Sequence, residues 1–242
     1  MKILSIGNSF SQDAQRYLHR IAEKNGRKIK NCNLYIGGCT LRKHYFNIID
    51  DEKAYQFQFN GEDTGIYVSI REALKSDEWD IVTIQQGSHQ SFDFEKYYKD
   101  YIDEIVDYVR LYAPQAKLVV HQTWAYKDNS ERLEKVGFKT TEDMFKAVQL
   151  CYREFAKQID ADGIIPSGAA MISAYRENSE IVHRDTFHAS LGFGRYMLGL
   201  LWFLCLFGKG TQIEHIDSFD VPVSNEEIQL AERIARNLAV EI

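Results

Sequence analysis

The stretch Lys2-Ile3-Leu4-Ser5-Ile6-Gly7-Asn8-Ser9-Phe10-Ser11 decides the fold. Its apolar part, residues 3–6, is typical of a strand that is buried on both faces of a parallel sheet. Gly7 allows the chain to turn sharply, and apolar residues at helical spacing predict a helix over residues 13–25. Ser9 therefore lies where a strand ends and a helix begins. Open α/β sheets bind their ligands at that edge.

A serine at this position has three interpretations. It can cap the following helix, as can Asn8 and Ser11. It can bind an anion, because a helix N-terminus presents free N–H groups and the positive end of a dipole. It can also be a nucleophile, which requires a histidine to accept the hydroxyl proton and donors that stabilise an oxyanion. The rest of the chain has to supply those groups.

Strand-like apolar runs alternate with amphipathic helical segments along the whole chain. This alternation predicts a parallel sheet covered by helices on both faces, with right-handed crossovers. We expect a single domain over residues 1–242, a three-layer α/β/α sandwich with five parallel strands in the flavodoxin-like order 2-1-3-4-5. The strands are predicted near residues 3–6, 28–35, 79–84, 117–121 and 162–165, and the longer helices at 13–25, 95–112, 141–159, from the 182–190 segment through 206, and 224–240.

One segment departs from this alternation. Tyr55, Phe57 and Phe59 alternate with glutamines, and Asn60-Gly61 is a turn signal. We expect a β-hairpin over residues 55–68 at one edge of the sheet. Its three rings should lie on one largely buried face, packed against the domain or against a second copy in a homo-oligomer.

Composition narrows the function classes. The 242 residues carry a net charge of −6 and no basic stripe, which argues against nucleic acid as a partner. The apolar segment 196–207 is too short to span a membrane. The N-terminus does not resemble a signal peptide, so we expect a cytoplasmic protein with no membrane partner. Four scattered cysteines without a CxxC pair predict reduced thiols rather than a zinc site, and we expect neither metal nor cofactor.

Polar or glycine-rich loops follow the strands. Gly37-Gly38 after the second strand indicates a tight turn, or a close backbone approach to a ligand with an N–H as donor. The loop 85–91, Gln-Gln-Gly-Ser-His-Gln-Ser, is dense in hydrogen-bonding side chains, and Trp124 lies in the loop after the fourth strand. Residues 129–140 are polar and are expected to form a mobile flap.

The Asp185-x-x-His188 spacing supplies the missing base. At the start of a helix, residues three apart share a face. A carboxylate there can bond one imidazole nitrogen, fix the tautomer and stabilise the imidazolium. A helix cap beside a partly buried histidine is the plainer interpretation, and His183 adds a metal site as a rival.

Together these blocks resemble the SGNH (GDSL-type) hydrolase superfamily. The matching residues are Gly7-Asn8-Ser9-Phe10, Gly38 and Asp185-Thr186-Phe187-His188, in the same order across nearly the whole chain. Asn8 replaces the aspartate of the usual Gly-Asp-Ser. The resemblance implies Ser9 as nucleophile, His188 as base and Asp185 as its orienting acid. It also implies an oxyanion hole formed by the N–H groups of Ser9 and Gly38 and by a side chain of the third block.

The third block departs from the family pattern Gly-x-Asn-Asp. If Gly87 aligns with that glycine, His89 stands in place of the asparagine. A subgroup of the carbohydrate esterases in the superfamily has a Gln-Gly pair instead, which resembles Gln86-Gly87. The loop 79–91, the hairpin before it and the run 123–126 resemble an uncharacterised bacterial branch of the superfamily. We therefore predict Gln86 as the third oxyanion donor, and Asn8, His89 and Trp124 as substrate contacts.

The implied function is hydrolysis of small esters through an acyl-enzyme. Acetyl groups, on a carbohydrate or another small molecule, are favoured because no long apolar lid is visible. Two alternatives remain open at the level of sequence. The strand–loop–helix could bind a phosphate or flavin phosphate without catalysis, or the chain could be an inactive SGNH-like protein that binds glycans.

Overall fold

In the computed structural model, which describes all 242 residues, the chain folds around one seven-stranded sheet. The order is β4-β3-β2-β1-β5-β6-β7. Within it β2, β1, β5, β6 and β7 are parallel and follow the predicted order 2-1-3-4-5. The strands are β1 Lys2–Gly7, β2 Lys30–Tyr35, β3 Tyr55–Phe59, β4 Glu62–Val68, β5 Ile81–Ile84, β6 Lys117–His121 and β7 Gly163–Ile165.

The strand count is seven rather than five because the predicted hairpin joins the sheet. Strand β3 pairs antiparallel with β2, and β4 pairs antiparallel with β3. The Asn60 N–H at the hairpin turn donates to the Asn31 carbonyl at 2.6 Å. The hairpin therefore extends the edge of the sheet and does not lie across its face.

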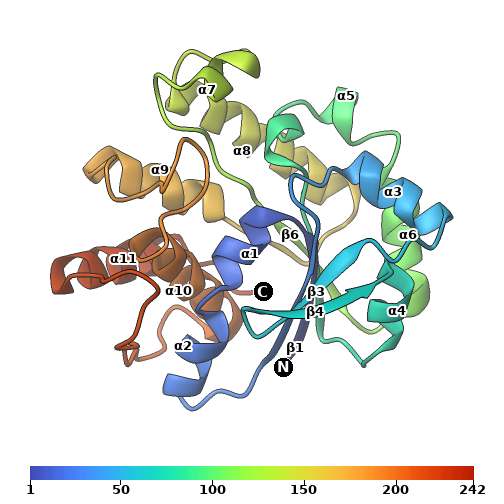
Figure 1. The fold of residues 1–242 in the computed structure, drawn as a ribbon, viewed down its shortest axis with the longest axis horizontal. Coiled ribbons are helices and arrows are strands. Elements are labelled where there is room, and N and C mark those ends of the chain that lie inside the picture. Colours follow the sequence, from blue (N-terminus) through green and yellow to red (C-terminus); the bar gives the residue numbers. More distant parts are fainter.

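Helices cover both faces of the sheet. Figure 1 shows α1, α2, α9, α10 and α11 on one side and α3, α4 and α6 on the other. This is the predicted three-layer α/β/α arrangement. The helices are α1 Ser9–Gln15, α2 Leu18–Lys24, α3 Leu41–Ile49, α4 Ile70–Lys75, α5 Phe94–Tyr97, α6 Ile102–Tyr112, α7 Glu131–Lys135, α8 Thr141–Gln158, α9 Ser167–Glu177, α10 Phe193–Phe207 and α11 Asn225–Leu238, with a 3₁₀ turn at Ser88–Gln90.

Two predicted helices are each divided in two. The helix expected over 13–25 starts earlier, at Ser9, and breaks between α1 and α2. At the break the Tyr17 hydroxyl donates to the Leu191 carbonyl at 2.7 Å, and Arg16 donates to the Gly61 carbonyl at 2.9 Å. Tertiary contacts of this kind override the local helical pattern. The helix expected over 95–112 is likewise divided into α5 and α6.

The aromatic face of the hairpin is only partly buried, contrary to the prediction. Tyr55 is fully buried, Phe57 is half-buried and Phe59 is 40% exposed. The β3–β4 register shifts between Phe57 and Gln58, so the two strands are not paired regularly along the hairpin. On the opposite face of β3, Gln58 is buried beside its β2 partner Asn33, from which it accepts a hydrogen bond at 2.8 Å.

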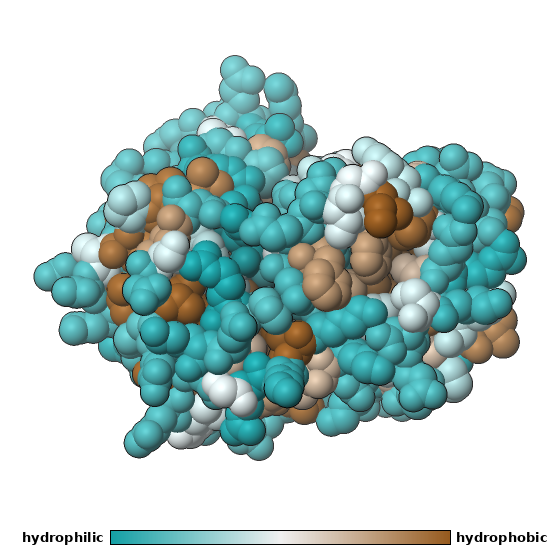
Figure 2. Space-filling model, turned by 60° about the horizontal axis from the view of Figure 1, so that its bottom comes forward, coloured by the Kyte–Doolittle hydropathy of each residue, from teal (hydrophilic) through white to brown (hydrophobic).

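The buried apolar residues of the strands and helices form one connected core on both faces of the sheet. Helix α10, the most apolar in the chain, is buried along nearly all of its length. Figure 2 shows a largely hydrophilic face on which hydrophobic residues gather in small separate areas. None of the helices has the length and apolarity required to cross a lipid bilayer.

Candidate active site

Ser9 is the first residue of α1, immediately after β1. Asn8 caps this helix in a capping box with Ser11, so the cap is Asn8 and not Ser9. Glycine is required at position 7, because a Cβ there would lie 2.2 Å from the Ser11 Oγ. As the first helical residue, Ser9 has an N–H without an intrahelical partner. Its residual exposure of 9% leaves the hydroxyl within reach of solvent.

The predicted base lies in a closed loop, not in the first turn of a helix. An isolated antiparallel bridge joins His183 to Ala189, and the Ser190 N–H donates to the Val182 carbonyl at 2.8 Å. Helix α10 begins only after Gly192. We call residues 182–190 the base loop. Because its ends are tied together, the loop presents its tip as one unit.

The three predicted triad residues come together. His188 Nε2 lies 3.0 Å from the Ser9 Oγ, and His188 Nδ1 lies 2.7 Å from Asp185 Oδ2. The other carboxylate oxygen accepts the N–H groups of Phe187 and His188, both at 2.8 Å. Serine, imidazole and carboxylate in this sequence of bonds form the arrangement that activates a hydroxyl for nucleophilic attack.

The Asp185 carboxyl stays ionised near neutral pH. Partial burial alone would raise its pKa, but the bonds from the His188 N–H and imidazole and from the Phe187 N–H outweigh that effect. The pKa is therefore lowered from its usual value. Because the ionised carboxylate accepts the hydrogen bond from His188 Nδ1, the lone pair of the other ring nitrogen, Nε2, faces the Ser9 hydroxyl.

Two further bonds hold the tip of the base loop. The Lys127 N–H donates to the Thr186 carbonyl at 2.8 Å, and the Trp124 indole N–H donates to the Phe187 carbonyl at 2.7 Å. Trp124 is fully buried and stacks on Phe10 with 3.8 Å between ring centroids. The structure thus places Trp124 beneath the base loop as a support, whereas the sequence suggested a substrate contact.

The loops after β2 and β5 meet beside Ser9. Gly38 is exposed and has φ +62°, in a turn that is closed by a 3.1 Å bond from the Cys39 N–H to the Ile36 carbonyl. A Cβ at Gly87 would approach the Cys39 carbonyl and a Thr40 methyl to 3.0 Å. The two loops are therefore packed as closely as glycine allows.

Gln86 is placed differently from the predicted oxyanion donor. Its side chain is fully buried, and the amide Nε2 donates to the Tyr97 carbonyl at 2.9 Å. The amide oxygen accepts the N–H groups of Leu41 at 2.8 Å and of Gly87 at 2.9 Å. These bonds make Gln86 a brace between the loops after β2 and β5.

Asn8 joins the same loops to the nucleophile. Its Nδ2 donates to the carbonyls of Cys39 at 3.1 Å and Gln86 at 3.3 Å, and its Oδ1 accepts the Phe10 N–H at 3.0 Å. The side chain is 2% exposed. Since both hydrogens of the amide are used within the protein, Asn8 is positioned as an organiser of the site, whereas the sequence suggested a substrate contact.

A buried polar chain behind Asn8 was not predicted from the sequence. Gln85 donates to Asn8 Oδ1 at 2.6 Å and lies 2.6 Å from His121 Nδ1, while His121 Nε2 lies 3.0 Å from the Ser167 hydroxyl. Burial lowers the pKa of His121 to about 3, so the imidazole is neutral. Polar residues at the ends of β5 and β6 were the available signal, because buried polar side chains pair with one another.

The other predicted histidines lie at the margin of the site. His89 is partly exposed on the 3₁₀ turn, and burial together with the positive charge of Arg132 lowers its pKa. The Arg132 guanidinium lies 3.8 Å above the Phe187 ring, next to His188. His183 is buried, which lowers its pKa to about 4. No group of three or more His, Cys, Asp or Glu side chains is arranged to hold a metal ion.

The segment expected to be a mobile flap contains the short helix α7. Ser130 caps it, and Leu133 is buried. One surface hollow of about 700 Å³ lies between residues 215–223 and the start of α11, away from the triad. The Asp185 side chain is exposed and that of His188 partly exposed, so solvent reaches the triad.

Comparison with known proteins identifies relatives along almost the whole chain. Residues 2–238 match the family described as "Domain of unknown function (DUF4886)". A crystal structure of a DUF4886 family protein from Bacteroides uniformis ATCC 8492 is 30% identical and has a TM-score of 0.88. The match covers 98% of this chain and 93% of that one.

More distant structures share the fold. A provisional SGNH hydrolase from Slackia heliotrinireducens gives a TM-score of 0.56 at 18% identity, with 98% of both chains covered. The lipase/acylhydrolase from Enterococcus faecalis gives 0.53 at 14% identity, covering 84% of this chain and 93% of that one. Among proteins of curated function, none matches this chain in sequence. The resemblance to SGNH hydrolases is confirmed at the level of the fold.

Proposed function

The chain belongs to the DUF4886 family and has the fold of SGNH hydrolases, and from that premise we propose that it is a serine ester hydrolase. The observation that carries the proposal is the chain of bonds from Ser9 through His188 to Asp185, at 3.0 and 2.7 Å. The hydroxyl, the imidazole and the carboxylate are bonded in the order that acyl transfer requires.

In the proposed reaction, the Ser9 Oγ attacks an ester carbonyl. His188 Nε2 accepts the serine proton and returns it to the oxygen of the leaving alcohol, and the carboxylate of Asp185 stabilises the imidazolium in between. Water, deprotonated by the same nitrogen, then attacks the acyl-serine and releases the acid. The cycle consumes one water and leaves the enzyme unchanged.

The developing oxyanion has backbone donors at hand. The N–H of Ser9 is free at the start of α1, and the exposed turn at Gly38 faces the same edge of the sheet. Fixed N–H donors stabilise the transition state by about 3–4 kcal/mol each in hydrolases of this type. Gln86 is not proposed as the third donor, because its side-chain amide donates to the Tyr97 carbonyl.

We propose small acyl groups, acetyl above all, carried on a small molecule or carbohydrate. The shallow position of the triad supports this substrate class, since the Asp185 side chain is 42% exposed and the His188 side chain 19%. A bulky alcohol such as a sugar can remain in solvent while its ester group reaches Ser9.

Two measurements test the proposal. Wild-type protein should hydrolyse an activated acetyl ester and should be labelled stoichiometrically by a fluorophosphonate at Ser9, as found by peptide mass mapping. Ser9→Ala should lose both properties while its circular dichroism spectrum stays unchanged. A folded wild-type protein that neither labels nor hydrolyses would leave a non-catalytic phosphate or glycan binder as the better interpretation.

A further inference from the structure

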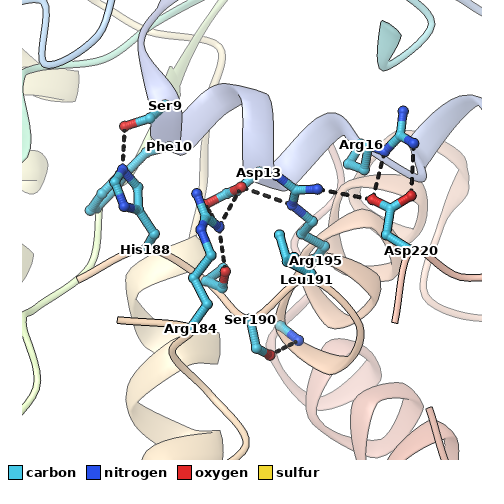
Figure 3. A network of polar contacts seen from close by, with 12 residues as sticks. Ser9, Phe10, Asp13, Arg16, Arg184, His188, Ser190, Leu191, Arg195 and Asp220 are labelled. Atoms are coloured by element: carbon cyan, nitrogen blue, oxygen red, sulfur yellow. Dashed lines mark hydrogen bonds and ion pairs between the residues drawn. The ribbon is translucent and has the colours of Figure 1, made fainter. Parts of the chain in front are cut away.

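Asp13 lies one helical turn after Ser9, and its carboxylate is completely buried. Figure 3 shows two arginines converging on it, Arg184 from the position before the triad acid and Arg195 from the start of α10. Arg184 Nη1 donates to the two carboxylate oxygens at 2.9 and 2.8 Å, and Arg195 Nε donates to Oδ1 at 2.9 Å. Bonds between ionised partners in a dry environment are the strong ones.

The two arginines flank the proposed base. Arg184 precedes His188 in the base loop, and Arg195 follows it in the first turn of α10. Arg184 Nη1 also donates to the carbonyl of Ala189, the residue after His188, at 2.6 Å. One guanidinium therefore contacts both the helix that carries the nucleophile and the loop that carries the base.

The other hydrogen bonds of the base loop lead elsewhere. Lys127 and Trp124, which bond the Thr186 and Phe187 carbonyls, belong to the segment after β6. Their hydrogen bonds fix the loop relative to the sheet, and Trp124 touches α1 through its stack on the Phe10 ring. Apart from the Ser9–His188 bond itself, the hydrogen bonds between α1 and the base loop all run through Asp13.

We propose that Asp13 is a positioning residue, which holds the base loop against α1 so that His188 Nε2 stays within 3.0 Å of the Ser9 Oγ. This inference rests on the proposed serine hydrolase function. Displacing a reacting group by about 1 Å lowers a rate on the order of a hundredfold. The Asp13 carboxylate bonds neither the Ser9 hydroxyl nor the His188 imidazole, so it acts through Arg184.

The network also supplies a control. On the side of the network away from Arg184, Arg195 Nη1 donates to Asp220 at 2.9 Å, and Arg16 donates to both oxygens of Asp220 at 2.8 and 2.7 Å. These ion pairs extend away from Ser9 toward the surface (Figure 3). Asp220→Asn weakens the same network while leaving the Asp13–Arg184 contact in place.

The experiment compares Asp13→Asn, Asp220→Asn and wild type. The rate constant of fluorophosphonate labelling and the kcat and KM for an activated acetyl ester are measured at a temperature at which circular dichroism shows every variant folded. We expect Asp13→Asn to lower kcat and the labelling rate at least tenfold with KM unchanged, because an asparagine cannot compensate two guanidinium charges. Asp220→Asn should stay within twofold of wild type in all three quantities.

A third variant keeps the test decisive if Asp13→Asn fails to fold. Arg184→Lys retains the positive charge beside Asp13, but an ammonium lacks the fork that also reaches Ala189. We expect its labelling rate to fall between those of wild type and Asp13→Asn. The inference about Asp13 would be overturned if folded Asp13→Asn or Arg184→Lys were labelled as fast as wild type. It would also be overturned if Asp220→Asn lost as much activity as Asp13→Asn. Neither result would affect the proposed function. Absence of labelling in wild type would instead overturn the proposed function.

Discussion

Replacing Asn8 by the aspartate that is usual in GDSL-type sequences should destabilise this protein. The carboxylate could still accept hydrogen bonds from the Phe10 N–H and from Gln85, as the amide oxygen does. It could not donate to the carbonyls of Cys39 and Gln86, which the Nδ2 of Asn8 now contacts at 3.1 and 3.3 Å. Two buried acceptors would lose their donor and face a negative charge.

The magnitude follows from the burial of the site. Each buried backbone acceptor left without a partner costs about 1–3 kcal/mol, so two cost about 2–6 kcal/mol. A negative charge at the N-terminus of α1 stabilises the helix by about 0.3–1 kcal/mol and offsets part of this cost. We therefore expect Asn8→Asp to lower the free energy of unfolding by about 1–6 kcal/mol at pH 7.5, which is the difference between these two effects.

Acidification should reduce this loss. The two carbonyl oxygens raise the pKa of the introduced carboxyl, because only its protonated form can donate to one of them. A group whose pKa is raised on folding contributes stability below its unfolded pKa and loses it as the pH rises through the folded value. The difference between wild type and Asn8→Asp in urea unfolding should therefore be smaller at pH 5 than at pH 7.5.

Asn25 offers a matched control. Its Nδ2 also donates to two carbonyls, those of Ile21 at 2.8 Å and Glu214 at 2.9 Å, but the side chain is only half-buried, so water can replace the lost donor. Asn25→Asp should cost about 1 kcal/mol or less. If Asn8→Asp unfolds within 1 kcal/mol of wild type at both pH values, Asn8 does not organise the site as described.

Three further outcomes are expected. Asp185→Asn should lower kcat for an acetyl ester about a hundredfold to a thousandfold with little change in KM, because the imidazolium loses its counter-charge; an unchanged kcat would remove Asp185 from the mechanism. Gln86→Leu should lower the free energy of unfolding by about 3–9 kcal/mol in urea, because two buried N–H groups and one partly buried carbonyl lose their partner at about 1–3 kcal/mol each; a loss of kcat at unchanged stability would restore Gln86 as an oxyanion donor. Acidification below pH 6.5 should destabilise the protein by about 1.4 kcal/mol per pH unit for each buried histidine. Burial lowers the pKa of His44 and His121 to about 3, so the unfolded chain takes up protons that the folded chain does not. Replacing His44 by glutamine should make the measured dependence of the unfolding free energy on pH less steep.

The parallel part of the fold was predictable because its signal is local. Each buried strand is a short apolar run, and the helices between them repeat at helical spacing, so strand order follows from the handedness of the crossovers. Helix α11 begins as predicted, with Ser224 as cap and Glu227 in the capping box. The breaks after Gln15 and Tyr97 were not predictable, because contacts with distant residues such as Leu191 accompany them.

The residues of the candidate site likewise include some that the sequence predicts and some that it does not. Ser9, Asp185 and His188 are recognised by residue type, order and neighbouring strand, and the structure brings them within hydrogen-bonding distance. The placement of Gln86 could not be read from its position, since a glutamine at a strand end can turn toward the ligand or toward a neighbouring loop. Its partners, the backbone groups of Leu41 and Tyr97, carry no signal in the sequence.

The contacts that complete the site also join distant parts of the chain. Ser9 and His188 are 179 residues apart in sequence, and Asp13 and Arg195 are 182 apart. Contacts of such long range form late, because the entropy of closing a long loop must be overcome first. During synthesis the nucleophile thus emerges long before its base, and a chain that has not yet reached the base loop has a serine without a partner. Fluorophosphonate reactivity should therefore return after helical circular dichroism during refolding, which would make it a marker for completion of the native state.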